Sequence, residues 1–342
     1  MQQGVIRAGN AKYIVLYSNP RALVATWPEY DMYADEWSRL EWRSGRPSTL
    51  YGAEPDENYM DFILYFWLRV FKEGVSDGIY FDNIYDATML DPVITRERLQ
   101  ADISTTTAYY PIFKLRELNR RAAVLLTQQG KLLYGRPLLL LHITDVNMLP
   151  VNSFAAGSIE WEMNFGSWPY PQRFSDAYLI TNSTGVQEGL MPQLITQVAQ
   201  GLDEKQREAI NNSLLAVAFG YGLMSHRYGG CPGDHYKSIQ NLVRNFGYGD
   251  STKTEVYPGW HPENPVKCNL PTVKVTAVKR NDRHWLLMIG NMASEATEAV
   301  LSLPGRFTFA DAESGEKLGN GNHITLPIGG FNYRLIELQT EM

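Results

Sequence analysis

The sequence has few cysteines. Only two, Cys231 and Cys268, occur in 342 residues, and this excludes the dense disulfide framework of small secreted domains. The two residues either pair with each other or remain as two buried thiols. No CxxC or HxxxH motif accompanies them, so the spacing does not predict a zinc site.

The sequence also lacks an apolar run long enough to cross a membrane. The longest candidates, FILYFWLRVF and PLLLLHI, are far shorter than the roughly 20 residues that a spanning helix needs. The first ten residues, MQQGVIRAGN, contain no apolar signal core. We therefore predict no membrane partner and no signal peptide.

An excess of basic residues is absent as well. The net charge is -6, whereas nucleic-acid-binding domains usually present a basic face. The segment YIVLYSNPRALV has no GxGxxG or GxxxxGK[ST] turn, and the chain has no GxSxG or HExxH motif. Nucleotide-binding sheets, serine hydrolases of the elbow type and HExxH metalloproteases are thus disfavoured, and no cofactor or metal is expected.

Aromatic residues, by contrast, are plentiful, with 20 Tyr, 13 Phe and 8 Trp. Strand and helix patterns alternate up to about residue 230. Continuous apolar strands in such an alternation are typical of a parallel sheet covered by helices. The predicted strands are 13–19, 78–83, 138–145, 157–166, 190–196 and 225–230, and the predicted helices are 59–73, 111–133 and 203–223.

These features favour a (β/α)8-type barrel. Five or six strands are fewer than the eight that a barrel needs, so either some strands are cryptic or the barrel is N-terminally incomplete. Residues 27–58 are predicted to form a long loop. From about residue 271 short strands alternate with turns, as in a small antiparallel β-sandwich. We expect a barrel domain over 1–262 and the sandwich domain over 263–342.

Polar side chains stand at the predicted strand ends, where barrel enzymes carry their active sites. The strand ends supply Asn19, Asp82, Asn83, Thr144, Asp145, Glu160, Glu162, His226, Arg227 and Tyr228. Because side chains two apart share a face of a strand, Glu160 and Glu162 point the same way. We expect them to face Asp82 across the barrel mouth. Most glycoside hydrolases use such a pair of carboxyl groups for catalysis.

Structural interpretations stay open for several of these residues. Asp82 is also a suitable cap for a following helix, and Asp145 a suitable turn residue. His142 lies inside an apolar strand, which favours a hydrogen-bonded core histidine over a ligand. Trp161 is equally suited to the core and to a platform for a sugar ring.

The order of motifs resembles retaining TIM-barrel glycoside hydrolases. The motifs are DGIYFDN, a later strand with Glu, the linker GWHPENPV, and a β-rich tail with FTFADAESGEKL and a final strand ending in LIEL. The chain looks most similar to the family-123-like hydrolases and their uncharacterised relatives. Those enzymes use an adjacent Asp-Glu pair, but here Asp82 is followed by Asn83. The arrangement looks more like barrel enzymes in which the Asp attacks the anomeric carbon directly, and the resemblance also implies an extracellular or periplasmic location.

The sequence therefore predicts a retaining glycosidase acting on an oligo- or polysaccharide, with Asp82 as nucleophile or transition-state stabiliser and Glu162 or Glu160 as general acid/base. Its predicted substrate-binding residues are Asn83, Tyr85, Asp145, Trp161, His226 and Tyr228. One alternative is a non-catalytic carbohydrate-binding or scaffold protein with a degenerate barrel. Another is a metal-dependent hydrolase that uses Asp82, Asp145 and His142.

Overall fold

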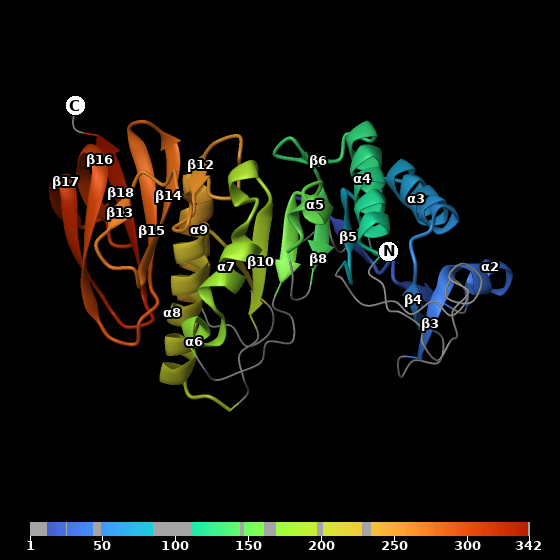
Figure 1. The fold of residues 1–342 in the computed structure, drawn as a ribbon. Coiled ribbons are helices and arrows are strands. Elements are labelled where there is room, and N and C mark those ends of the chain that lie inside the picture. Colours follow the sequence, from blue (N-terminus) through green and yellow to red (C-terminus); the bar gives the residue numbers. More distant parts are fainter. Residues whose placement is uncertain are drawn as a thin grey trace. The chain divides into compact units, whose positions relative to one another are not determined.

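The structure is a computed structural model (Figure 1). It describes residues 12–24, 26–43, 49–84, 111–143, 147–160, 169–196, 201–227 and 234–340. The chain divides into two compact units, Met1–Ser158 and Ile159–Met342, and we describe each by itself. Within the described residues, no helix is both long and apolar enough to span a bilayer.

A parallel sheet forms the core of the first unit. Strand β5 (Gly78–Phe81) lies between β1 (Val15–Ser18) and β8 (Leu139–His142), and both pairings are parallel. Ile79 and Phe81 have no exposed surface, so this face of β5 is covered. The sequence pattern predicted all three strands, because each is a short and nearly continuous apolar run.

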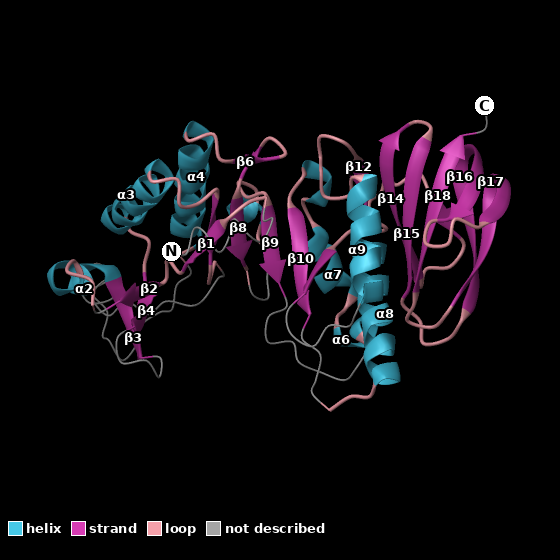
Figure 2. Ribbon diagram, turned by 180° about the vertical axis from the view of Figure 1, so that it is seen from behind, coloured by secondary structure: helices cyan, strands magenta, loops and turns pink. Residues whose placement is uncertain are grey.

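Two helices, α3 (Glu57–Lys72) and α4 (Ile112–Gln128), follow β4 and β5 in the chain and lie side by side (Figures 1 and 2). Tyr59, Ile63 and Trp67 recur every four residues on α3 and are buried, as expected for one apolar stripe facing a core. The predicted alternation of strands and helices is thus confirmed for this unit.

The prediction of a long loop over 27–58 was wrong. The segment contains α2 (Tyr30–Trp37), β3 (Ser38–Arg43) and β4 (Thr49–Ala53), and β4 pairs antiparallel with β3 and with β2 (Ala22–Val24). Trp37 is buried and packs against Tyr59 and Phe62, with ring centroids 5.0 and 4.9 Å apart. A search for strand patterns does not find this small sheet, because the segment is rich in Gly, Pro and acidic residues. Aromatic packing on α3 stabilises it instead.

Short elements complete the first unit. A two-residue turn joins β6 (Leu132–Leu133) to β7 (Arg136–Pro137), and the two strands form a hairpin. It is followed by β8 and by α5 (Leu149–Asn152), and β9 (Gly157–Glu160) begins at the end of the unit. The side chain of Asn119 on α4 donates to the carbonyl of Val151 at 3.1 Å, which ties α5 to the helix layer.

The second unit begins with helices and one parallel strand pair. β10 (Met191–Thr196) pairs with β11 (Met224–Arg227). The connection between these strands contains α8 (Glu204–Tyr221), which starts at a capping box formed by Asp203 and Gln206. Before it come α6 (Tyr170–Arg173), α7 (Asp176–Ser183) and the 3₁₀ turn η3 (Val186–Glu188). After it comes α9 (Asp234–Phe246), an amphipathic helix that the sequence analysis did not predict.

The end of the chain forms a seven-stranded antiparallel sheet (Figure 2). Its strands are β12 (Glu255–Tyr257), β13 (Lys267–Cys268), β14 (Val273–Asn281), β15 (His284–Asn291), β16 (Thr297–Asp311), β17 (Lys317–Ile328) and β18 (Tyr333–Thr340). The order is β12-β14-β15-β18-β16-β13, and β17 pairs with β16. The predicted β-rich C-terminal region is therefore confirmed.

Both faces of strand β15 are buried. On β15, Leu286 and Met288 pack in a cluster with residues of α8, whereas Leu287 and Ile289 belong to a second cluster made by the sheet itself. This follows from the two-residue alternation of a strand. A complete eight-stranded barrel and a domain boundary after residue 262 stay predictions.

Candidate functional site

Three side chains meet at the carboxyl ends of β1, β5 and β8: Tyr17, Asp82 and His142. The chain after β5 is held between its two neighbours. The amide of Asp82 donates to the carbonyl of Ser18 at 2.9 Å, and the amide of Ile84 donates to the carbonyl of His142 at 2.9 Å. These bonds fix the backbone that carries the carboxylate.

The carboxylate of Asp82 accepts three hydrogen bonds from described residues. Its Oδ2 accepts from the hydroxyl of Tyr17 at 2.5 Å. Its Oδ1 lies 2.7 Å from Nδ1 of His142 and accepts from the amide of Asn83 at 2.8 Å. Because an ionised carboxylate only accepts hydrogen bonds, Nδ1 of His142 carries the proton in this contact.

Asn83 shapes the turn that makes these contacts. Its φ of +58° lies in the left-handed region, which Asn enters more readily than most residues. The backbone therefore reverses directly after Asp82, and the Asn83 amide is aimed at the carboxylate. The described role of Asn83 is thus to form the turn, and substrate binding by its side chain stays a prediction.

The ionised form of Asp82 is favoured at this site. Burial tends to raise the pKa of the carboxyl group. Hydrogen bonds from His142 and Tyr17, the electrostatic attraction of His142 and the hydrogen bond from the Asn83 amide together lower the pKa by more than burial raises it. The net result is a pKa below the usual range. Asp82 is thereby suited to act as a carboxylate and not as a proton donor.

Aromatic rings line up beside the carboxylate. Tyr17 meets Tyr80 edge to face with centroids 5.5 Å apart, and Tyr80 lies 6.3 Å from the ring of His142. Tyr17 and Tyr80 are register partners in β1 and β5, so their shared face follows from the pairing. His142 is 2% exposed and Tyr17 is 60% exposed. The site therefore has a buried side and a side open to solvent.

The other predicted residues are described only in part. Tyr85, Asp145, Trp161, Glu162 and Tyr228 lie outside the described residues. His226 stands on β11, where only its backbone is described. Glu160 ends β9 and is 1% exposed. It belongs to the second unit and Asp82 to the first, so their pairing stays a prediction.

Sequence reasoning missed Tyr17 altogether and gave His142 no role beside Asp82. A signal for Tyr17 was present, because it lies on an apolar strand two residues before Asn19, the polar strand end that was recognised. The expectation of a hydrogen-bonded core histidine agrees with the buried His142, whose partner is Asp82. In the described part of the chain, no three His, Cys, Asp or Glu side chains are grouped in a way that could hold a metal ion.

The first unit also contains a groove of about 510 Å³. We call it the aromatic groove. It is bordered by β1, by the turn before α2 and by one face of α3. Its lining residues are Leu16, Tyr17, Ser18, Trp27, Pro28, Glu29, Phe62, Ile63, Phe66, Trp67 and Val70. Tyr17 belongs both to this groove and to the Asp82 cluster.

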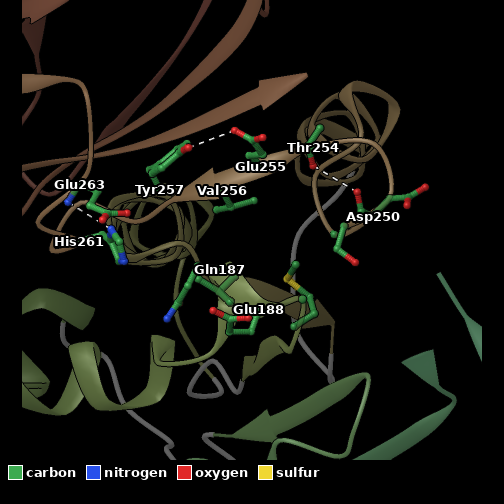
Figure 3. A pocket seen from close by; sticks show the side chains of 14 residues that line it. Gln187, Glu188, Asp250, Thr254, Glu255, Val256, Tyr257, His261 and Glu263 are labelled. Atoms are coloured by element: carbon green, nitrogen blue, oxygen red, sulfur yellow. Dashed lines mark hydrogen bonds between the residues drawn. The ribbon is translucent and has the colours of Figure 1, made fainter. Parts of the chain in front are cut away.

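A smaller pocket of about 320 Å³ lies in the second unit (Figure 3). Its walls carry Glu188, Asp250, Glu255 and Glu263. Asp250 and Glu255 have local partners. Asp250 accepts from the Thr252 hydroxyl and amide and pairs with Lys253, and Glu255 accepts from the Tyr257 hydroxyl at 3.0 Å. No residue predicted from the sequence lines this pocket, which favours the Asp82 cluster as the candidate site.

No protein-family model matches the chain, and no curated protein is similar to it in sequence. Solved structures are similar in fold. A maltogenic α-amylase from Thermotoga neapolitana aligns over 96% of this chain and 78% of its own, with a TM-score of 0.56 and 9% identity.

Two further solved structures give the same result. The alignment with a GH27 β-L-arabinopyranosidase from Geobacillus stearothermophilus covers 90% of this chain and 69% of the chain of that enzyme, with a TM-score of 0.54 and 11% identity. The α-galactosidase I of Mortierella vinacea covers 85% and 73%, with a TM-score of 0.50 and 14% identity. The chain thus has a glycoside hydrolase-like fold.

Proposed function

We propose that the chain is a retaining glycoside hydrolase with Asp82 as its nucleophile. The observation that supports it is the Asp82 carboxyl group at the carboxyl end of β5, hydrogen-bonded by Tyr17 and His142 in a glycoside hydrolase-like fold; the lowered pKa of Asp82 agrees with this role. Carboxyl ends of parallel strands are where barrel enzymes do chemistry. The finer resemblance to family-123-like enzymes is not needed for this assignment.

The hydrogen bonds of Asp82 indicate which oxygen attacks. A carboxylate oxygen has two lone pairs. From the described residues, Oδ1 accepts two hydrogen bonds and Oδ2 accepts one, from Tyr17. Oδ2 therefore retains a lone pair for the anomeric carbon, while His142 and Asn83 hold the other oxygen in place.

The reaction then has two steps. Oδ2 of Asp82 forms a bond to the anomeric carbon as the glycosidic C–O bond breaks, and Glu162 or Glu160 gives its proton to the leaving oxygen. In the second step the same glutamate takes a proton from water. The resulting hydroxide attacks the anomeric carbon and releases Asp82 with overall retention. Tyr85, Asp145, Trp161, His226 and Tyr228 are proposed to bind the sugar.

The test is hydrolysis of 4-nitrophenyl glycosides that differ in sugar and anomeric configuration. Asp82→Asn should lower kcat/KM by at least about 10³-fold, since a missing nucleophile removes the covalent step. Asp61→Asn is the matched control, because Asp61 lies on the exposed surface of α3 and pairs with Arg121. That variant should keep full activity.

Azide separates chemistry from folding. Azide added to Asp82→Ala should take the place of the carboxylate and yield a glycosyl azide of inverted configuration, which a merely misfolded variant cannot form. Turnover that survives unchanged in Asp82→Asn, Glu160→Gln and Glu162→Gln would refute the assignment. Binding of sugars without turnover would instead support a non-catalytic carbohydrate-binding protein.

A further inference from the structure

We propose that the aromatic groove binds a flat apolar aglycone, so that the preferred substrates are aryl glycosides whose sugar reaches Asp82. The second part of this statement rests on the proposed function. The groove volume of about 510 Å³ falls within the 300–1,000 Å³ typical of small-molecule sites. The residues predicted from the sequence to act in catalysis or to bind the sugar do not line it.

The shape of the groove follows from α3 and the turn before α2. Ile63, Phe66, Trp67 and Val70 present one stripe of α3, and Trp27, from the turn before α2, packs against Phe62 of the same helix. Phe66 is 40% exposed although it is a large apolar residue. Exposed apolar surface gathered in a concavity is typical of binding sites.

The rings are arranged to accept another ring. Trp27 lies 5.8 Å from Phe62, and Phe62 meets Phe66 edge to face with centroids 4.9 Å apart. Edge-to-face and offset arrangements at 4.5–7 Å are the favourable geometries for aromatic pairs. An aryl group between Trp27 and Phe66 would extend the same pattern.

The chemistry of the lining favours an aglycone over a second sugar. Among the described lining residues, the polar side-chain groups belong to Tyr17, Ser18, Trp27, Glu29 and Trp67, and the remaining six side chains are apolar. A sugar ring carries several hydroxyl groups, and each buried hydroxyl without a partner is costly. A flat apolar group has no such requirement.

Tyr17 connects the groove to the reacting centre. Its hydroxyl donates to Oδ2 of Asp82, and the same residue belongs to the groove lining. A ligand in the groove that contacts Tyr17 is therefore separated from the carboxylate by this one residue. An aglycone in the groove would place the glycosidic bond beside Asp82.

The direct test is to measure the binding of 4-nitrophenol by isothermal titration calorimetry, on the full chain carrying Asp82→Asn. We expect saturable binding that Phe66→Ala and Trp27→Ala each weaken by about tenfold, the size of one aromatic contact. Phe113→Ala is the matched control, because Phe113 is 85% exposed and does not line the groove. Methyl glycosides and free sugars should not compete with 4-nitrophenol.

Several outcomes would overturn the proposal. The first two are absence of 4-nitrophenol binding and equal binding by Phe66→Ala and Phe113→Ala. The third is a dimer in solution that Phe66→Ala dissociates, since a second copy of the chain would then occupy the groove. Groove-dependent binding without hydrolysis of any glycoside would keep the groove as an aryl site and refute the catalytic role of Asp82. The two proposals therefore fail in different experiments.

Discussion

Gly290 on β15 offers a quantitative test of how the second unit is built. An added Cβ at this position would lie 2.0 Å from the carbonyl oxygen of Ala216 on α8, and 2.7 Å from both the Ala216 carbonyl carbon and the Met292 methyl group. Non-bonded atoms prefer separations of about 3.5–4.0 Å, so α8 would have to retreat by about 1.5 Å.

The retreat would loosen a well-packed interface. Leu286 and Met288 share a buried cluster with α8, and inserting a methyl group into a packed core costs about 1–3 kcal/mol. We expect Gly290→Ala to fall at the upper end, about 3 kcal/mol, because the clash is with backbone atoms that cannot rotate away.

The assay is urea denaturation followed by the fluorescence of Trp285, which is 6% exposed on β15, together with the other tryptophans. Gly305→Ala is the matched control. Gly305 lies in β16 of the same sheet, and its added Cβ would meet only Phe307 at 3.7 Å, so its effect should stay within about 0.5 kcal/mol. Equal denaturation midpoints for the two variants would refute the tight α8–β15 contact.

Two further predictions concern the pH response and a helix cap. The pKa of Asp82 is lowered in the folded state, so its ionisation stabilises the fold above about pH 4 and this stabilisation is lost as the pH falls through the folded pKa. Tyr17→Phe should reduce that stabilisation and so lower the free energy of unfolding relative to wild type. This difference should be largest at pH 6 and should shrink below pH 4. A difference that is independent of pH would contradict the reasoning. Asp203→Ala removes the capping box of α8 and should cost about 1 kcal/mol in urea denaturation, whereas Asp282→Ala, at a highly exposed turn residue, should cost less than half of that.

The sequence predicted long apolar elements well and short mixed ones poorly. α3 and α4 carry a buried face over several turns, and α8 is buried on all sides from Ser213 to Tyr221. Long apolar segments of this kind are visible without a structure. Strands β3 and β4 lie in the segment that the sequence predicts to be a loop, and the order of this segment depends on Trp37 packing against Tyr59 and Phe62. Tertiary contacts of this kind override local pattern and cannot be derived from spacing.

The catalytic and binding roles predicted for the candidate site stay predictions, and the sequence indicated only part of its geometry. Asp82 could be identified because the carboxyl-end rule needs only the position of one strand. Its contacts with Tyr17 and His142 depend on which strands are neighbours, and β8 is more than 50 residues away from β5 in the chain. Alternation showed which way each side chain points, but strand order decides which side chains meet.

His142 bears on whether the cluster is functional or structural. A buried ion pair is weak evidence for stability, since apolar residues of similar volume often serve as well or better. The neighbours of His142 in β8 are leucines, so an apolar residue would fit this strand. The chain instead retains an imidazole, 2% exposed, that holds one oxygen of Asp82 while the other oxygen lies beside the solvent-exposed Tyr17. An oriented carboxylate with one side open is what a nucleophile requires, and this openness supports the proposed role of Asp82 beside its contribution to the stability of the fold.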